Sequence, residues 1–202
     1  MLRRLLMVSV LLSVSAHAEV PNSGKPFAVA GERVDAPLLA GTKLAYMAGD
    51  GKGEFIAEFA DPKEDIARWQ KRFVAQQRVN DTLPNTVKRT LHSVRSACSA
   101  LGKPEVFAPQ KEMAKFKGDM LALRFHCQQA MPNAPLGELT AMLFLQGQQH
   151  TFKYWRSWRP QNQQQLQEAL KESNRFFSSS LKDADLCNPQ ASRACRNPLL
   201  PQ

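Results

Sequence analysis

Four cysteines are the residues of this 202-residue chain best placed to form covalent bonds: Cys98, Cys127, Cys187 and Cys195. The N-terminal residues, considered below, indicate export, and an even number of cysteines in an exported chain predicts two disulfides. Cys98 falls in an apolar stripe of helical spacing, and Cys127 ends an alternating apolar run typical of a strand. Both thiols would face one core, so we expect Cys98–Cys127 to join a helix to the sheet. Cys187–Cys195 would close a small loop near the C-terminus.

Metal and redox chemistry are not expected at these cysteines. The sequence contains no Cys-x-x-Cys pair, which argues against a thioredoxin-like centre and a standard zinc site. His126 adjoins Cys127, but neighbouring residues of a strand point to opposite faces and cannot easily bind one ion. We therefore expect no metal and no other cofactor.

Three histidines could act as general bases after removal of the leader: His92, His126 and His150. Their partners in a triad could converge from anywhere in the chain. The sequence contains no Gly-x-Ser-x-Gly elbow, His-Glu-x-x-His helix or P-loop. These observations favour a protein without catalytic activity and leave an envelope hydrolase with a cryptic site as the alternative.

A basic stripe on one predicted helix is the first candidate binding surface. Lys88, His92 and Arg95 follow each other at spacings of four and three, which places them on one side of a helix. The plainest interpretation is a helix side that faces solvent. The alternative is a docking surface for an acidic partner.

A cluster of aromatic and basic residues is the second candidate: Trp155, Arg156, Trp158 and Arg159. Aromatic residues and arginine are enriched at binding hot spots, and arginine can stack on tryptophan. Strand alternation places the two tryptophans on opposite sides, so we expect one of them in the core. The alternative is that the whole cluster serves packing.

The first eighteen residues have the pattern of a signal peptide. Arg3 and Arg4 precede an apolar run over 5–14 that is too short to span a bilayer, and Ala16-His17-Ala18 matches a cleavage site. We expect cleavage after Ala18 and a location in the periplasm, with a buried N-terminal helix as the alternative. No later stretch is apolar enough to predict a transmembrane segment.

The charge distribution is uneven along the chain. Without the two leader arginines, 25 basic and 18 acidic side chains remain, a net charge of +7, and residues 61–128 alone carry +6. The excess thus belongs to the folded body, which favours an acidic protein or an anionic envelope component as partner. The alternative is that the charge serves solubility. Nucleic acid is not an expected partner outside the cytoplasm.

The hydropathy pattern predicts an α+β fold with an antiparallel sheet, formed by an N-terminal hairpin and a three-stranded meander. About three helices would pack on one face of this sheet. The expected strands are 43–48, 54–60, 105–108, 119–128, 138–146 and 149–158, and the expected helices run from Asp61 to about Asn80, from Asn85 to Leu101, and from 161 or 162 to about Leu181. Residues 19–42 would form an extended lead-in, 43–187 a single domain and 188–202 a tail with the disulfide loop.

Together these features favour an exported, periplasmic, non-catalytic binding domain that recognises an acidic partner. Such a protein could be an inhibitor, an immunity-type protein or an accessory of an envelope complex. The alternatives are the hydrolase named above and a structural protein that binds an anionic envelope polymer.

Overall fold

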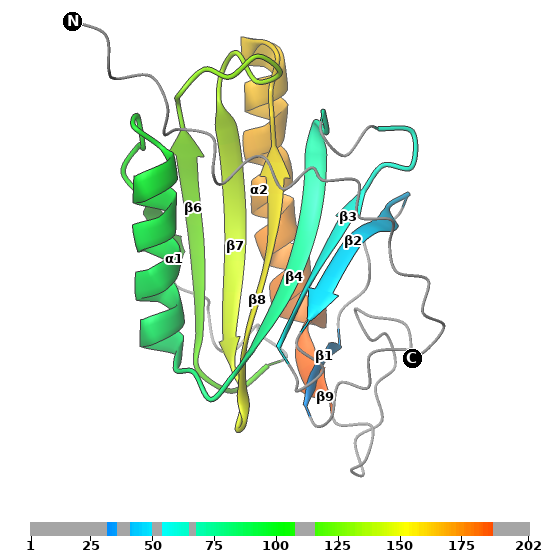
Figure 1. The fold of residues 1–202 in the computed structure, drawn as a ribbon, viewed down its shortest axis with the longest axis vertical. Coiled ribbons are helices and arrows are strands. Elements are labelled where there is room, and N and C mark those ends of the chain that lie inside the picture. Colours follow the sequence, from blue (N-terminus) through cyan, green and yellow to red (C-terminus); the bar gives the residue numbers. More distant parts are fainter. Residues whose placement is uncertain (1–31, 36–40, 50–53, 65–67, 108–115, 188–202) are drawn as a thin grey trace, which may run out of the picture.

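A computed structural model of the chain describes residues 32–35, 41–49, 54–64, 68–107 and 116–187. Its main feature is a seven-stranded antiparallel sheet with a helix on each side (Figure 1). The strands are β2 (Lys43–Gly49), β3 (Phe55–Ala60), β4 (Lys71–Val79), β5 (Glu105–Phe107), β6 (Met120–Cys127), β7 (Glu138–Gln146) and β8 (His150–Trp158). They lie in the order β2-β3-β4-β8-β7-β6-β5. The α+β class is thus confirmed, as are the hairpin and the meander.

A second, two-stranded sheet joins distant parts of the chain. It pairs β1 (Arg33–Asp35) with β9 (Asp185–Cys187) in antiparallel register. The predicted lead-in thus contributes one short strand, and most of its residues lie outside the described ranges. The predicted signal peptide and the tail over 188–202 also lie outside them.

The prediction of a helix over 61–80 is wrong, because residues 71–79 form strand β4 instead. Phe73 and Ala75 are buried in the main core, and Val74 on the opposite face is fully buried. β4 is bonded to β3 on one side and to β8 on the other, so both edges of its backbone are satisfied. Tertiary pairing thus overrides the helical spacing of the apolar residues.

Residues 61–64, which resemble the start of a helix, form a turn before β4. The carboxylate of Asp61 accepts a hydrogen bond from the backbone N–H of Lys63 at 2.8 Å. The carboxylate of Glu64 accepts one from the backbone N–H of Gln70 at 3.0 Å. Such side-chain to backbone bonds serve turns as well as helix caps, so the sequence signal was ambiguous.

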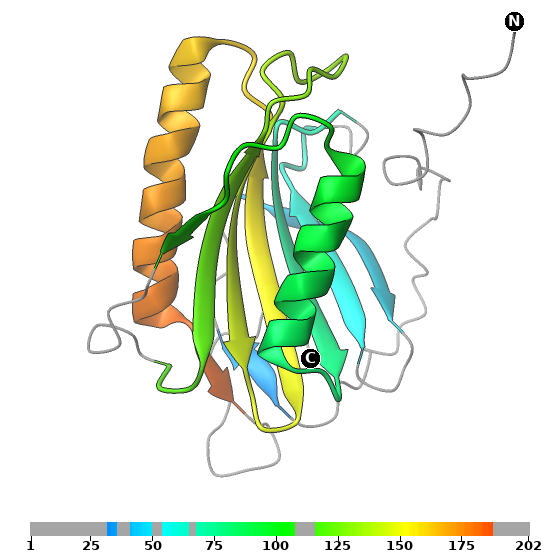
Figure 2. The same cartoon turned by 90° about the vertical axis from the view of Figure 1, so that its left-hand side faces the viewer.

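Two helices, α1 (Leu83–Ala97) and α2 (Gln163–Asp183), pack on opposite faces of the sheet (Figure 2). This corrects the expectation of about three helices on one face. The reason lies in β7, where every residue from Leu139 to Leu145 is buried. A strand that is apolar on both faces requires a cover on both. Leu143 faces the core under α2, and Phe144 faces the core under α1.

The apolar stripe of α1 is confirmed, although the helix has other bounds than predicted. Leu83, Val87, Leu91 and Val94 of this stripe pack against a buried cluster on β6 and β7. The cluster consists of Leu123, Phe125, Met142 and Phe144. The N-cap is Thr82 and not Asn85, because Pro84 fits the first turn of the helix and does not precede it. The helix ends at Ala97 with Cys98 as C-cap, and not at the predicted Leu101.

The corrected N-cap leads to a test by paired substitutions. The Thr82 hydroxyl accepts a hydrogen bond from the backbone N–H of Asn85 at 3.4 Å. We expect Thr82→Ala to lower the free energy of unfolding by about 1 kcal/mol. Asn85→Ala, on the exposed first turn, should cost less than about 0.5 kcal/mol. Urea unfolding of both variants measures the difference, and a larger loss for Asn85→Ala would contradict the assignment.

The disulfide Cys98–Cys127 is confirmed, with an S–S distance of 2.11 Å. It fastens the C-terminal end of α1 to the end of β6. Cys187 ends β9, but Cys195 lies outside the described residues, so the second disulfide stays a prediction. Neither described helix combines the length and apolar character that a membrane span requires.

Candidate functional site

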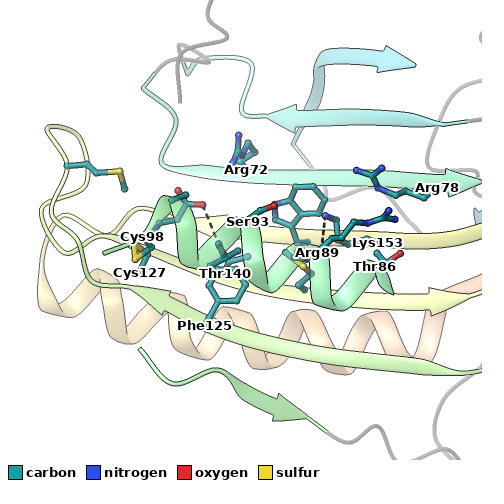
Figure 3. Close-up of a pocket in the computed structure, with 17 residues that line it drawn as sticks. Arg72, Arg78, Thr86, Arg89, Ser93, Cys98, Phe125, Cys127, Thr140 and Lys153 are labelled. Atoms are coloured by element: carbon teal, nitrogen blue, oxygen red, sulfur yellow. Dashed lines mark hydrogen bonds between the residues drawn. A yellow bond between two sulfur atoms is a disulfide. The ribbon is translucent and has the colours of Figure 1, made fainter. Parts of the chain in front are cut away.

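A cleft lies between α1 and the neighbouring face of β8 and β4. Its volume is about 350 Å³. α1 packs over β6 and β7 through its apolar stripe, and the cleft opens where the helix no longer covers the sheet. Figure 3 shows the lining side chains projecting from α1 and from the strands beneath it. The disulfide lies at one end of the cleft, and a group of basic side chains lies at the other.

Strand alternation explains which residues reach the cleft. On β8, Lys153 and Trp155 point to the α1 side, while Phe152 and Tyr154 are buried in the core under α2. The register pairs Lys153 with Gln76 and Trp155 with Val74 of β4. Arg72 and Arg78 of β4 share this phase and therefore line the same cleft.

Lys153 is the central cation of the site. Its Nζ donates a hydrogen bond to the Thr90 hydroxyl of α1 at 3.3 Å and lies 4.7 Å from the centre of the Trp155 ring. Burial, together with the charges of Arg78 and Arg89, lowers the pKa of Lys153 to about 8. Among the described residues, Lys153 forms no ion pair.

The other cations of the cleft each have a carboxylate partner. Arg72 contacts Glu58 at 3.1 Å, and Arg78 contacts Glu54 at 3.8 Å. Arg89 pairs with Asp81, just before α1. Burial alone would raise the pKa of Asp81, but hydrogen bonds from Thr86 and the Thr82 backbone and the Arg89 charge lower it overall. Asp81 is therefore ionised at neutral pH and balances Arg89.

Apolar side chains line part of the opposite end of the cleft. Phe125 and Met142 form its floor on β6 and β7, and both are buried. Val94 of α1 contributes from above, and the Cys98–Cys127 disulfide closes this end. Glu138, the acidic residue of the lining, is held by Arg159 at 3.3 Å. The cleft thus combines a basic end with an apolar floor, and Arg72, Thr140 and Glu138 add polar groups near the disulfide end.

The predicted basic stripe lies outside this cleft. Lys88, His92 and Arg95 are exposed on α1, and none of them lines the cavity. Arg89, next to Lys88 in sequence, turns into it instead. Whether the stripe binds a partner stays a prediction.

The structure separates the members of the predicted aromatic and basic cluster. Trp155 alone lines the cleft. Trp158 is 2% exposed, and its indole N–H donates to Glu172 at 2.7 Å. Arg156 contacts the same carboxylate at 3.3 Å. Arg159 is 5% exposed and its guanidinium lies 3.7 Å from the centre of the Trp69 ring. Three of the four residues therefore have internal partners.

Sequence reasoning missed the basic residues of the cleft. Lys153 stands two residues before Trp155, so alternation along β8 could have revealed that the two share a side. Arg72 and Arg78 gave no comparable signal, because their segment resembles a helix and their neighbours across the sheet lie about 80 positions away in sequence.

The three histidines lie in different parts of the structure. His92 is exposed on α1, whereas the Nε2 of His126 lies 2.7 Å from the Leu136 carbonyl oxygen. His150 is 6% exposed, and neither ring nitrogen has a hydrogen-bond partner among the described residues. Within those residues, no group of three or more His, Cys, Asp or Glu side chains is arranged to hold a metal ion.

Comparison with protein-family models, curated proteins and solved structures gives no match to this chain. Its site must therefore be interpreted from its own geometry and chemistry.

Proposed function

We propose that this chain is an exported, non-catalytic binding domain that takes up the negatively charged group of a partner or ligand in the cleft beside α1. One observation carries the proposal: Lys153 lies in the cleft without a carboxylate partner among the described residues. The basic stripe on α1 offers a further contact surface if the partner is a macromolecule.

The energetics of Lys153 support a binding role. A buried cation without a counter-charge costs free energy, and such costs concentrate at sites where a ligand supplies the missing charge. Arg78 and Arg89 add to the positive potential at Lys153, although each of them also has its own carboxylate partner. An unpaired lysine therefore has a clearer role in binding than in stability.

The disulfide supports the proposed location. Disulfides persist mainly in oxidising compartments such as the bacterial periplasm, and Cys98–Cys127 forms part of the cleft wall. Together with the leader pattern over 1–18, this favours a periplasmic protein whose site is assembled after export.

An anionic fluorophore with apolar rings tests the proposed function. Anilinonaphthalene sulfonate should bind the native protein, and Lys153→Met should weaken this binding at least tenfold, since the sulfonate loses its counter-charge. Raising the pH from 7 to 10 should weaken binding to the native protein, because Lys153 has a pKa of about 8. The Lys153→Met variant should show a much smaller pH effect. Fluorescence titration measures all four affinities.

Lys88→Met is the matched control, since it removes one positive charge from the exposed side of the same helix. It should change the affinity by less than about twofold at physiological salt, because exposed charges are screened. Equal weakening by both variants would show that net charge, and not the cleft, governs binding. Weakening by Lys88→Met alone would move the site to the α1 stripe.

The hydrolase and polymer-binding alternatives receive less support. His126 contacts a backbone carbonyl oxygen, and His150 has no hydrogen-bond partner among the described residues, so neither is held beside a nucleophile there. A long anionic polymer could lie along the exposed stripe on α1, but it would leave the unbalanced charge inside the cleft without a partner. A single acidic group fits this arrangement better.

A further inference from the structure

We infer that the occupant of the cleft is a small amphipathic monocarboxylate, with its carboxylate at Lys153 and an unbranched apolar tail directed toward the Cys98–Cys127 disulfide. This inference rests on the proposed function and deepens it, because it names the chemical class of the ligand. Three features of the cleft carry it: its charge balance, its two chemically different ends and its size.

The charge balance selects a ligand with one negative charge. The basic end contains Lys153, Arg78 and Arg89. Arg78 and Arg89 are balanced by Glu54 and Asp81, which leaves one positive charge at Lys153. A carboxylate neutralises that charge, whereas a dianionic phosphate would bring a second negative charge close to two carboxylates already present.

The groups around Lys153 can hold a carboxylate. The ammonium has three donors, of which one is used by the Thr90 hydroxyl. Because that hydroxyl acts as acceptor for Lys153, its own O–H is available as a donor. A carboxylate beside both groups would receive hydrogen bonds from the sheet and from the helix. The head would thus join the two walls of the cleft.

The remainder of the cleft suits an apolar tail. Trp155 and Met142 lie side by side on β8 and β7, and Phe125 of β6 lies nearer the disulfide. Met142 pairs directly with Trp155 across β7 and β8. Methionine and aromatic side chains adapt to flexible apolar groups better than polar walls do. The tail would exclude water from this surface.

The volume sets the length of the ligand. A cavity of about 350 Å³ corresponds to about twelve water-sized groups. Decanoate has about that number of heavy atoms and carries one negative charge. Decanoate is therefore the probe of choice. Neither a folded protein nor a polymer could enter the cleft as completely as decanoate.

Calorimetric titration with decanoate tests this inference. We expect one molecule to bind per chain, with affinity increasing two- to fourfold per methylene from hexanoate to decanoate. Beyond that length the increase should level off because the cavity is filled. Decanol, which lacks the charge, and acetate, which lacks the tail, should each bind at least tenfold more weakly than decanoate. Lys153→Met should lose the preference for decanoate over decanol, and Lys171→Met, which removes an exposed charge on α2 outside the cleft, should keep it.

The outcomes separate this inference from the proposed function. If the fluorophore binds through Lys153 but decanoate binds no better than decanol, the ligand class is wrong and the anion site stands. If decyl phosphate binds tenfold more tightly than decanoate, the single-charge argument is wrong. If a Glu-rich peptide displaces the fluorophore through Lys153 and decanoate does not, the occupant is a protein segment. If decanoate binds native protein and Lys153→Met equally, the proposed head position is wrong.

Discussion

Replacing Lys153 with methionine should raise the free energy of unfolding at pH 7 by about 2 to 3 kcal/mol. The pKa of this lysine is lowered from 10.5 to about 8, chiefly by burial, and one pKa unit corresponds to about 1.4 kcal/mol. Methionine has a similar length, packs well beside Trp155 and carries no charge to desolvate. Urea unfolding of both proteins measures the gain.

The same pKa shift determines how the stability gain of Lys153→Met depends on pH. Between about pH 8 and 10.5 the unfolded chain binds more protons at Lys153 than the folded chain, so the stability of the native protein rises with pH there. The cost of burying the charged lysine is fully present below pH 8 and is removed above 10.5. The stability advantage of Lys153→Met should therefore be largest at neutral pH and shrink through this interval.

This result would distinguish a functional lysine from a structural one. A variant that is more stable and binds anions less well shows that the charge serves binding at the expense of stability. Lys88→Met should change stability by less than about 0.5 kcal/mol, because Lys88 is exposed. If Lys153→Met lowered stability at neutral pH, the lysine would have a stabilising partner and the proposal would lose its main support.

Removal of the Cys98–Cys127 disulfide should have the largest effect on stability. The bridge closes a loop with a sequence separation of 29, and the loop-entropy model then gives a stabilisation of about 3.5 kcal/mol. The double variant Cys98→Ala/Cys127→Ala should lose about this amount in urea unfolding. It leaves Cys187 and Cys195 untouched, whereas a reducing agent would also act on any bridge that they form.

The disulfide should also affect the cleft more than the rest of the sheet. Its loss frees the C-terminal end of α1, so amide exchange should increase most over the last turns of that helix. The strand β4, which is far from the bridge in the sheet order, should change little. A loss of less than about 1 kcal/mol, or an exchange increase spread evenly over the chain, would show that packing alone holds α1 in place.

Much of the local structure could be predicted from periodicity. β7 has its predicted bounds, Glu138–Gln146, and α2 starts at Gln163, close to its predicted start at 161 or 162. The pairing of Cys98 with Cys127 also followed from one helical stripe and one alternating run. In these segments the local pattern and the tertiary environment favour the same structure.

The strand β4 and the placement of the helices could not be predicted in this way. The segment 71–79 contains apolar residues at spacings that suit a helix, and only its pairing with β3 and β8 makes it a strand. The run of apolar residues in β7 indicates cover on both faces, but it does not say which segments supply that cover. Its neighbours in the sheet decide this, and they come from distant parts of the chain.

The features of the candidate site can also be divided into those that the sequence predicts and those that depend on the tertiary structure. The sequence by itself determined most of the local elements other than β4, the excess of positive charge and the pairing of Cys98 with Cys127, because each depends on neighbouring residues or simple counts. Only the tertiary structure decided that Trp158 and Arg159 are enclosed by internal partners, and that Lys153 lies beneath α1 with Arg78 beside it. The physical reason is that burial and charge balance depend on which side chains meet across strands and helices, and this chain brings them together from α1, β4 and β8.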